Sequence, residues 1–224
     1  MGLPRVREAE WMDEPGVPEG ELRGALAYIR GVNRWLGYNR ATRGRVGEWV
    51  REGGGGVVTV LDVATGSGDV PEDAGRAFGD RVRVVGLDLH PVTIREARER
   101  VPGCGFVRGD ATRLPFADGA FDYVMTSMFV HHLPEAVIVE VLKEMWRVAR
   151  KGVLVADLVR NRRALFWIHV FTVGASAMIK HDARVSVRQA LTGAEIAGLA
   201  KEAGWVGLDL RMHFGHRFTL VGGK

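Results

Sequence analysis

Short apolar runs alternate with apolar residues at helical spacing along most of the chain. The runs predict strands, and the amphipathic stretches between them predict helices. The predicted strands span residues 57–63, 82–87, 104–108, 121–127, 152–158, 205–212 and 216–222. The predicted helices span about 71–79, 91–101, 134–149 and the stretch from the capping box Thr192–Glu195 to Gly204. This alternation predicts an α/β fold, a doubly wound and mainly parallel seven-stranded sheet whose two closing strands form an antiparallel C-terminal edge.

The first 52 residues differ from this pattern. Residues 1–20 are charged and contain several prolines, which predicts an extended arm. Apolar positions between Glu21 and Arg51 predict two amphipathic helices broken around Gly37. Four glycines, Gly53–Gly56, then precede the first strand. We therefore expect an N-terminal arm and helical cap over residues 1–52 and a main domain over residues 53–224.

Three consecutive predicted strands end in an aspartate, and the first runs into a glycine-rich turn. Asp62 precedes the turn Ala-Thr-Gly66-Ser-Gly68, and Asp88 and Asp110 follow the next two strands. Ligands of parallel α/β sheets bind at the carboxyl ends of the strands, so one ligand is expected to lie along all three acids. Glycine lets the backbone approach such a ligand, and the next helix directs its N–H groups toward it. Asp62 would repel a pyrophosphate, which favours a cationic or amphoteric ligand.

A nicotinamide dinucleotide is the alternative ligand for this turn. The dinucleotide pattern places a third glycine three residues after the second, where this chain has Pro71. Proline is tolerated near the start of a helix, but the close helix–strand packing that the third glycine allows is lost. The sequence therefore disfavours, without excluding, a nicotinamide-dependent oxidoreductase.

Five segments in the same order resemble the class I S-adenosylmethionine-dependent methyltransferases, near the type that acts in ubiquinone and menaquinone biosynthesis. They are the acid–glycine turn at residues 62–68, Asp88, Asp110-Ala111, the stretch Leu114–Val124 and the turn Met128–Leu133. The resemblance covers residues 57–159 strongly and implies a Rossmann-like fold, S-adenosylmethionine as the cofactor and methyl transfer as the activity. It also implies that residues 53–224 are the methyltransferase domain. The residues that it assigns to the cofactor are Asp62, Ala64, Thr65, Gly66, Gly68, Asp88, Leu89, Asp110, Ala111 and Ser127.

Histidines are the candidates for a base that would deprotonate a phenol or an acidic ring carbon. His131 and His132 follow the fourth strand, near the expected position of the methyl group, although the family often uses this turn only to cap the next helix. His181-Asp182 is the other candidate pair, and a polar loop between helices is the competing interpretation. The histidines lack metal-ligand spacing on a helix, so we expect no metal.

The segment Ala164–Ile179 is mostly apolar and follows the fifth strand, where this family inserts substrate-recognition elements. We expect an acceptor-site insertion over residues 160–190, with this segment either packed on the sheet edge or forming an apolar wall of the acceptor site. The acceptor would then be a small apolar or aromatic molecule: phenolic, quinone-like or polyketide-derived. In similar enzymes the N-terminal segment closes over the cofactor, which makes Asn33 and Arg34 candidates for its carboxylate, with simple helix packing as the alternative.

The net charge of +4 comes from dispersed, mostly arginine residues, which argues against nucleic acid as a partner. The single cysteine, Cys104, excludes an internal disulfide and a cysteine-based metal site. The stretch Met1–Asp13 is charged and has no apolar segment of signal-peptide length, and the apolar segment 164–179 is short for a stable membrane insertion, so we expect a cytoplasmic protein. A homodimer remains open. So does a protein that binds S-adenosylmethionine without transferring its methyl group.

Overall fold

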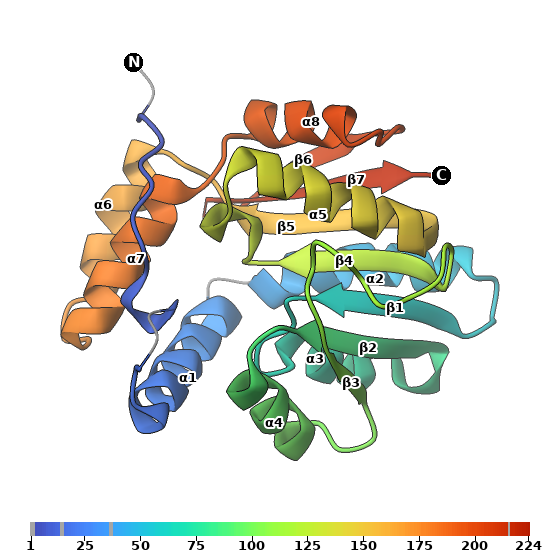
Figure 1. The fold of residues 1–224 in the computed structure, drawn as a ribbon, viewed down its shortest axis with the longest axis horizontal. Helices are drawn as coiled ribbons and strands as arrows, with labels where there is room; N and C mark the ends of the chain where they lie inside the picture. Colours follow the sequence, from blue (N-terminus) through green and yellow to red (C-terminus); the bar gives the residue numbers. More distant parts are fainter. Residues whose placement is uncertain (1–2, 14–15, 36–37, 215) are drawn as a thin grey trace.

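The computed structural model describes residues 3–13, 16–35, 38–214 and 216–224, and its core is one seven-stranded sheet (Figure 1). The strand order is β3-β2-β1-β4-β5-β7-β6. Strands β1 to β5 are parallel, and β7 is antiparallel to both β5 and β6. The strands are β1 (Val58–Val63), β2 (Val82–Asp88), β3 (Gly105–Arg108), β4 (Phe121–Ser127), β5 (Ala149–Leu158), β6 (Asp209–His213) and β7 (Arg217–Gly223).

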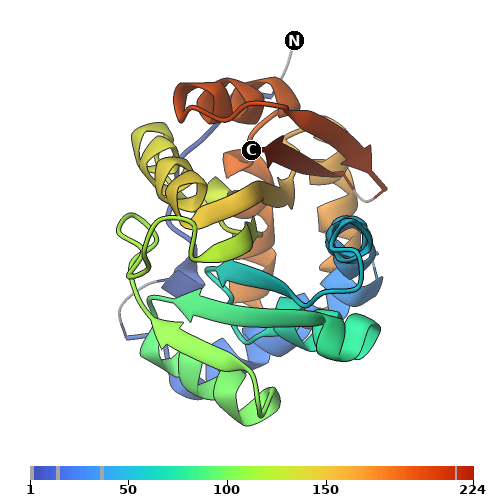
Figure 2. The same cartoon turned by 90° about the vertical axis from the view of Figure 1, so that its right-hand side faces the viewer.

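Two layers of helices cover the sheet because successive strand positions point to opposite faces. On one face Val60, Val84 and Met125 pack with α2 (Tyr38–Glu52) and α3 (Asp69–Phe78). On the other face Leu61 and Val153 pack with α5 (Glu135–Val148) and α8 (Gly193–Glu202). Figure 2 shows the sheet nearly edge-on between these layers. The doubly wound α/β prediction is confirmed.

Four helices begin at a residue whose side chain caps the first turn: α4 (Pro91–Arg100), α6 (Arg162–Phe171), α7 (Ala177–Gln189) and α8. The side chain of Thr192 caps α8 in a complete capping box with Glu195, as predicted. The ring of His90 accepts from the backbone N–H of Val92 at the start of α4, which has proline in its first turn. These caps fix the start of α4 after β2 and the start of α8 after α7.

The remaining helices and the arm lie beyond the carboxyl ends of the parallel strands (Figure 1). They are α1 (Glu19–Trp35), α6 (Arg162–Phe171), α7 (Ala177–Gln189) and the arm with its short 3-10 helix η1 (Trp11–Asp13). In the described part of the chain, no helix combines the length and hydrophobicity that a membrane span requires.

The region after β5 differs from the prediction. The apolar segment 164–179 is divided between α6 and α7, because Gly174 has a φ of 84° and Ser176 caps a new helix. His181 and Asp182 lie inside α7, so the interpretation of this pair as a polar loop is wrong. Strand β6 is also shorter than predicted and begins at Asp209.

The arm is fastened to α7 and to the turn after β4 by side chains far apart in the sequence. The Arg5 guanidinium donates to the carbonyl oxygens of Gln189 (2.6 Å) and Leu133 (3.0 Å) and pairs with Glu135. The backbone N–H groups of Trp11 and Met12 donate to the two oxygens of Asp182, at 2.8 and 3.1 Å. The arm is thereby held along one side of the strand ends.

Candidate functional site

A cavity of about 1250 Å³ opens at the carboxyl ends of the strands. One side is formed by the turns after β1, β2, β3 and β4, and the other by α1, α6, α7 and the arm. Single-ligand pockets commonly measure about 300–1,000 Å³. This cavity is therefore larger than the usual single-ligand pocket.

The glycine-rich turn after β1 lines one end of the cavity through Ala64, Thr65 and Gly66. The φ angles of Ala64 (57°) and Gly66 (55°) are left-handed, which turns the chain sharply at the strand end. The backbone N–H of Gly66 donates to Asp88 (2.9 Å), and that of Thr65 donates to the carbonyl of Leu87 (2.9 Å). These bonds fasten the turn to the end of β2.

Gly68 is absent from the residues that line the cavity. A Cβ on Gly68 would lie 3.2 Å from Phe106, 3.3 Å from Val101 and 3.4 Å from Ala97. Its small size therefore permits close packing of the turn on α4 and β3. In the dinucleotide pattern the third glycine permits such close packing, whereas in this chain Gly68 permits it.

Asp62 lies beneath the turn and is fully buried, and it too is absent from the cavity lining. One carboxylate oxygen accepts from the Thr65 hydroxyl at 2.6 Å, and the other has no hydrogen-bond partner among the described residues. Burial raises the pKa of Asp62 to about 7, and the nearby charges of Asp88 and Asp69 add to the increase. Asp62 therefore positions the turn and places a titratable charge under it.

Asp88 and Leu89 line the cavity at the end of β2. The Asp88 carboxylate accepts from Gly66 and, at 2.9 and 3.0 Å, from the backbone N–H of His90 and the hydroxyl of Thr93. Since a carboxylate has about four acceptor positions, one remains for a ligand hydroxyl. Leu89 presents an exposed apolar side chain beside it.

Asp110, Ala111 and Ser127 also line the cavity, after β3 and at the end of β4. Oδ1 of Asp110 accepts from the N–H and the hydroxyl of Thr112, both at 2.8 Å, which fixes the turn. The cavity thus contains a row of acceptors and backbone groups along the strand ends. A Cβ on Gly66 would meet no atom within 4 Å, so the space over the turn is open. This surface fits an adenosyl group with a charged amino-acid end.

His131 and His132 line the cavity where the strand ends meet the arm. They belong to a 3-10 helix, η3 (Val130–His132), directly after β4. Nδ1 of His131 is 2.7 Å from Asp157 at the end of β5, and both side chains are 2 % exposed. Burial alone would raise the pKa of Asp157, but the His131 ring beside it lowers that pKa on balance. Asp157 is therefore an acceptor, and Nδ1 of His131 carries the hydrogen.

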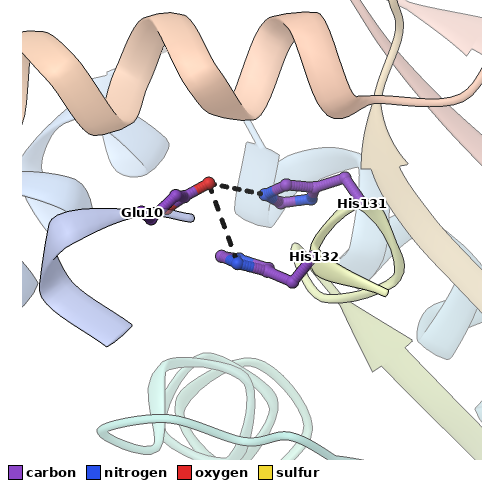
Figure 3. A group of neighbouring side chains, drawn as sticks. All are labelled: Glu10, His131 and His132. Carbon is purple, nitrogen blue, oxygen red and sulfur yellow. Dashed lines mark ion pairs between the residues drawn. The ribbon is translucent and has the colours of Figure 1, made fainter. Parts of the chain in front are cut away.

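Glu10 of the arm reaches the same place (Figure 3). Its Oε1 lies 3.8 Å from Nε2 of His131 and 3.7 Å from Nδ1 of His132. The hydroxyl of Ser186 on α7 donates to this same oxygen at 2.6 Å. Glu10 is 4 % exposed, so the arm delivers a buried carboxylate to the two histidines.

His181 is not among the cavity-lining residues. Its ring stacks on Trp11 with centroids 4.2 Å apart, and its two nitrogens contact Asp182 (3.0 Å) and Glu8 (3.2 Å). The bond with Asp182 raises the pKa of His181. The predicted histidine–aspartate pair exists, and both of its members contact the arm, while Asp182 alone lines the cavity.

The wall opposite the strand ends is largely apolar. It comprises Met12, Leu22, Leu26, Ile29, Val32, Ile168, Phe171, Ile179 and Val187. Residues of α6 and α7 contribute to it, as expected if the segment after β5 forms part of an acceptor site. The side chains of Asn33 and Arg34 lie outside the described residues.

Sequence analysis did not identify Glu10, Asp157 or Ser186 as site residues. Asp157 carries the same signal as the three predicted acids, since it stands near the end of a parallel strand. Glu10 and Ser186 lie in an arm and within a helix, and no local motif marks either of them. The path of the arm brings Glu10 to the cavity, and the position of α7 brings Ser186 there.

Comparisons with known proteins agree with this architecture. Residues 60–152 match a family model described as a methyltransferase domain. The chain is 34 % identical over 166 residues to a demethylmenaquinone methyltransferase of Beutenbergia cavernae, covering 68 % of this chain and 67 % of the relative. It is 30 % identical over 168 residues to the enzyme of that name from Roseiflexus castenholzii, covering 68 % and 69 %.

Solved structures share the fold at low sequence identity. Human N-acetylserotonin methyltransferase in complex with S-adenosylmethionine superposes with a TM-score of 0.68 at 16 % identity, covering 92 % of this chain and 56 % of that one. Magnesium protoporphyrin IX methyltransferase of Synechocystis with bound S-adenosylhomocysteine gives 0.61 at 14 % identity, covering 86 % and 87 %. These similarities support the fold.

Proposed function

The chain belongs to the class I S-adenosylmethionine-dependent methyltransferases, and on that premise we propose that it methylates a small, apolar or aromatic acceptor. The acceptor classes are phenolic, quinone-like and polyketide-derived molecules, with the methyl group going to oxygen or carbon. Family membership decides against a nicotinamide-dependent oxidoreductase and for an enzyme that uses S-adenosylmethionine. The observation that supports the acceptor class is the two-sided cavity, with strand-end acceptors on one side and an apolar wall on the other.

The cofactor half of the proposal rests on the strand ends. Asp88 would bind the ribose, and the backbone at Gly66 would lie next to it. Asp110 and Ala111 would bind the adenine edge beside Leu89. Ser127 at the end of β4 would lie near the amino-acid end. Asp62 would act from beneath the turn, where its negative charge favours a cationic ligand.

The acceptor half rests on the apolar wall and on the histidines between the two halves. When bound, the cofactor supplies an electrophilic methyl group on a positively charged sulfur, and the bonding electron pair stays on sulfur as the methyl leaves. The residues of the cavity would hold the acceptor against the methyl group, and such positioning alone would contribute several kcal/mol. His131 and His132 would take the proton of an acceptor hydroxyl, and the nearby carboxylates of Asp157 and Glu10 would stabilise the positively charged ring that results.

Two measurements test the proposal. Calorimetric titration should show saturable binding of S-adenosylmethionine and none of NAD. Methyl transfer from labelled S-adenosylmethionine should then be measured with a panel of phenols, hydroquinones and polyketide-type phenols, each paired with a charged analogue of the same size. Turnover of apolar members only is the expected result, whereas transfer only to the charged analogues would refute the acceptor class.

The histidine roles are tested with separate His131→Ala and His132→Ala variants. Each should bind the cofactor as the wild type does and lose about 10²–10⁴-fold in turnover if it is the base. His169→Ala is the matched control, because His169 is exposed on α6 and does not line the cavity. Full turnover in both variants would show that neither histidine deprotonates the acceptor.

A further inference from the structure

Glu10, His131 and His132 converge on one point of the cavity, although they come from two distant parts of the chain (Figure 3). One ligand atom of each lies within 4.8 Å of those of the other two. The measured separations from Oε1 of Glu10 are 3.8 Å to Nε2 of His131 and 3.7 Å to Nδ1 of His132. All three residues line the cavity, so the point between them is accessible to a small ligand.

Two imidazole nitrogens and one carboxylate oxygen form a ligand set that divalent transition metals accept. Ligands about 2.1 Å from a tetrahedral or octahedral ion are roughly 3.0–3.4 Å from one another. The two separations from Glu10 exceed that range by a few tenths of an ångström, and the nitrogens of the two histidines lie within 4.8 Å of each other. Side-chain rotations would be needed to bring the three atoms to bonding distance.

The surrounding contacts orient these atoms as metal sites require. Asp157 accepts from Nδ1–H of His131 at 2.7 Å, which leaves the lone pair on Nε2, the atom that faces Glu10. This carboxylate–histidine arrangement is the usual outer support of a metal-bound imidazole. Ser186 donates to Oε1 of Glu10 at 2.6 Å and fixes that side chain. The ligand atoms are thus held in place by residues of β5 and α7.

Electrostatics also favours a cation at this point. Glu10 is 4 % exposed and His131 is 2 % exposed, so the carboxylate and the imidazole lone pair are both largely removed from water. A buried carboxylate is costly unless a positive charge compensates it. A metal ion between the three atoms would provide that charge.

We propose that Glu10, His131 and His132 bind a divalent transition-metal ion, with Zn²⁺ as the expected occupant. Three protein ligands leave at least one coordination position open to the cavity. The part of the proposal that concerns the acceptor rests on the proposed function but replaces the histidine base in it, because an imidazole bound to the ion cannot also accept a proton. An acceptor oxygen would enter the open position, where the bound cation lowers the pKa of its hydroxyl and the released proton passes to solvent. The prediction of no metal depended on spacing within one helix, and these ligands come from an arm and a turn.

Metal binding is measured first, without cofactor or acceptor. The full chain is freed of metal by chelation, titrated with Zn²⁺ by calorimetry, and examined with Co²⁺ by visible absorption. One ion per chain and a Co²⁺ spectrum with nitrogen and oxygen ligands are expected. Absence of binding by either ion would overturn the proposal.

Variants locate the site. Glu10→Gln and His132→Ala should each weaken Zn²⁺ binding by at least about 100-fold, and Asp157→Asn by about 10–100-fold as an outer support. His169→Ala controls for adventitious binding to exposed imidazole and should leave the affinity unchanged. Each variant must still bind S-adenosylmethionine, which separates loss of the site from loss of the fold. Unchanged Zn²⁺ affinity in Glu10→Gln and His132→Ala would refute the assignment.

Activity separates the two proposals. If the open position holds the acceptor, chelation should abolish methyl transfer to hydroxyl-bearing acceptors and Zn²⁺ should restore it. Full turnover of the metal-free chain would overturn the role of the ion toward the acceptor. Failure to methylate any member of the acceptor panel, with Zn²⁺ binding intact, would instead refute the proposed function.

Discussion

Replacing Asp62 with asparagine should stabilise the ligand-free protein at alkaline pH. Asp62 is fully buried beneath the glycine-rich turn, and one of its oxygens has no hydrogen-bond partner among the described residues. Burial raises its pKa from 3.8 to about 7. The unfolded chain therefore releases this proton at lower pH than the folded chain does, and stability falls as the pH rises between these two values.

The magnitude follows from the two pKa values. Each pKa unit corresponds to about 1.4 kcal/mol, so ionised Asp62 lowers the free energy of unfolding by about 4 kcal/mol at roughly pH 8. At roughly pH 5 the folded protein keeps the proton, and the cost is only about 2 kcal/mol. The wild type should thus lose about 2–3 kcal/mol from this group between the two pH values, and Asp62→Asn should lose none.

Urea unfolding of the wild type and Asp62→Asn at both pH values measures this difference. The asparagine amide also changes the buried hydrogen bonds, but that contribution is the same at both pH values and cancels. Asp122→Asn is the matched control: the pKa of Asp122 is lowered, so Asp122 is ionised in both states throughout this range and its replacement should have a pH-independent effect. If the change in the free energy of unfolding caused by Asp62→Asn is also independent of pH, the argument is refuted.

The same variant connects stability with cofactor binding. If the buried carboxylate is kept because its charge favours the cationic cofactor, Asp62→Asn should weaken S-adenosylmethionine binding at the pH where it stabilises the free protein. Calorimetry at roughly pH 8 gives this affinity. A variant that is more stable and binds S-adenosylmethionine equally well would show that the Asp62 charge does not serve cofactor binding.

Three further predictions concern the turn, the ribose acid and the arm. Gly68→Ala should lower the free energy of unfolding by about 2–3 kcal/mol, because φ is 83° and the new Cβ meets Phe106. Gly66→Ala should lower it by only about 1–2 kcal/mol but should weaken cofactor binding. Urea unfolding measures the first quantity and calorimetry the second. Asp88→Ala should weaken S-adenosylmethionine binding ten- to a hundredfold through loss of hydrogen bonds worth about 1.5–3 kcal/mol, and unchanged affinity would remove Asp88 from the ribose. Asp182→Ala should free the arm, seen as faster proteolysis before residue 13 with cofactor affinity retained, and an equally resistant arm would contradict this.

The sheet could be predicted from the sequence because its signals are local. Each strand from β1 to β5 is a short apolar run, and parallel strands place their carboxyl ends at one edge of the sheet. Asp88 and Asp110 therefore reach the cavity by the strand they follow, without knowledge of any distant contact. The same rule was incomplete for Asp62, because a residue within the strand can be buried beneath the turn and outside the cavity lining.

The acceptor side could not be predicted in the same way. Ala164–Ile179 has the composition of one apolar helix, but Gly174 and Ser176 divide it, and the second helix continues through His181 and Asp182. The adjacency of His181 and Asp182 in the sequence suggested chemistry, whereas their partners, Trp11 and Glu8, lie in the arm. Such contacts depend on tertiary packing, which no local period encodes.

Glu10 shows why substitutions can alter the acceptor side of the site more easily than the cofactor side. The cofactor side consists of strand ends, whose positions are fixed by the hydrogen bonds of the sheet and the packing of its core. Glu10 is held by an arm that contacts α7 and the turn after β4, among others through Arg5, Trp11 and Met12. Substitutions in the arm, α6 or α7 can therefore alter the acceptor side without disturbing the sheet. It follows that a shared cofactor turn is weak evidence for a shared acceptor, and that acceptor assignments should be argued from the arm and α7.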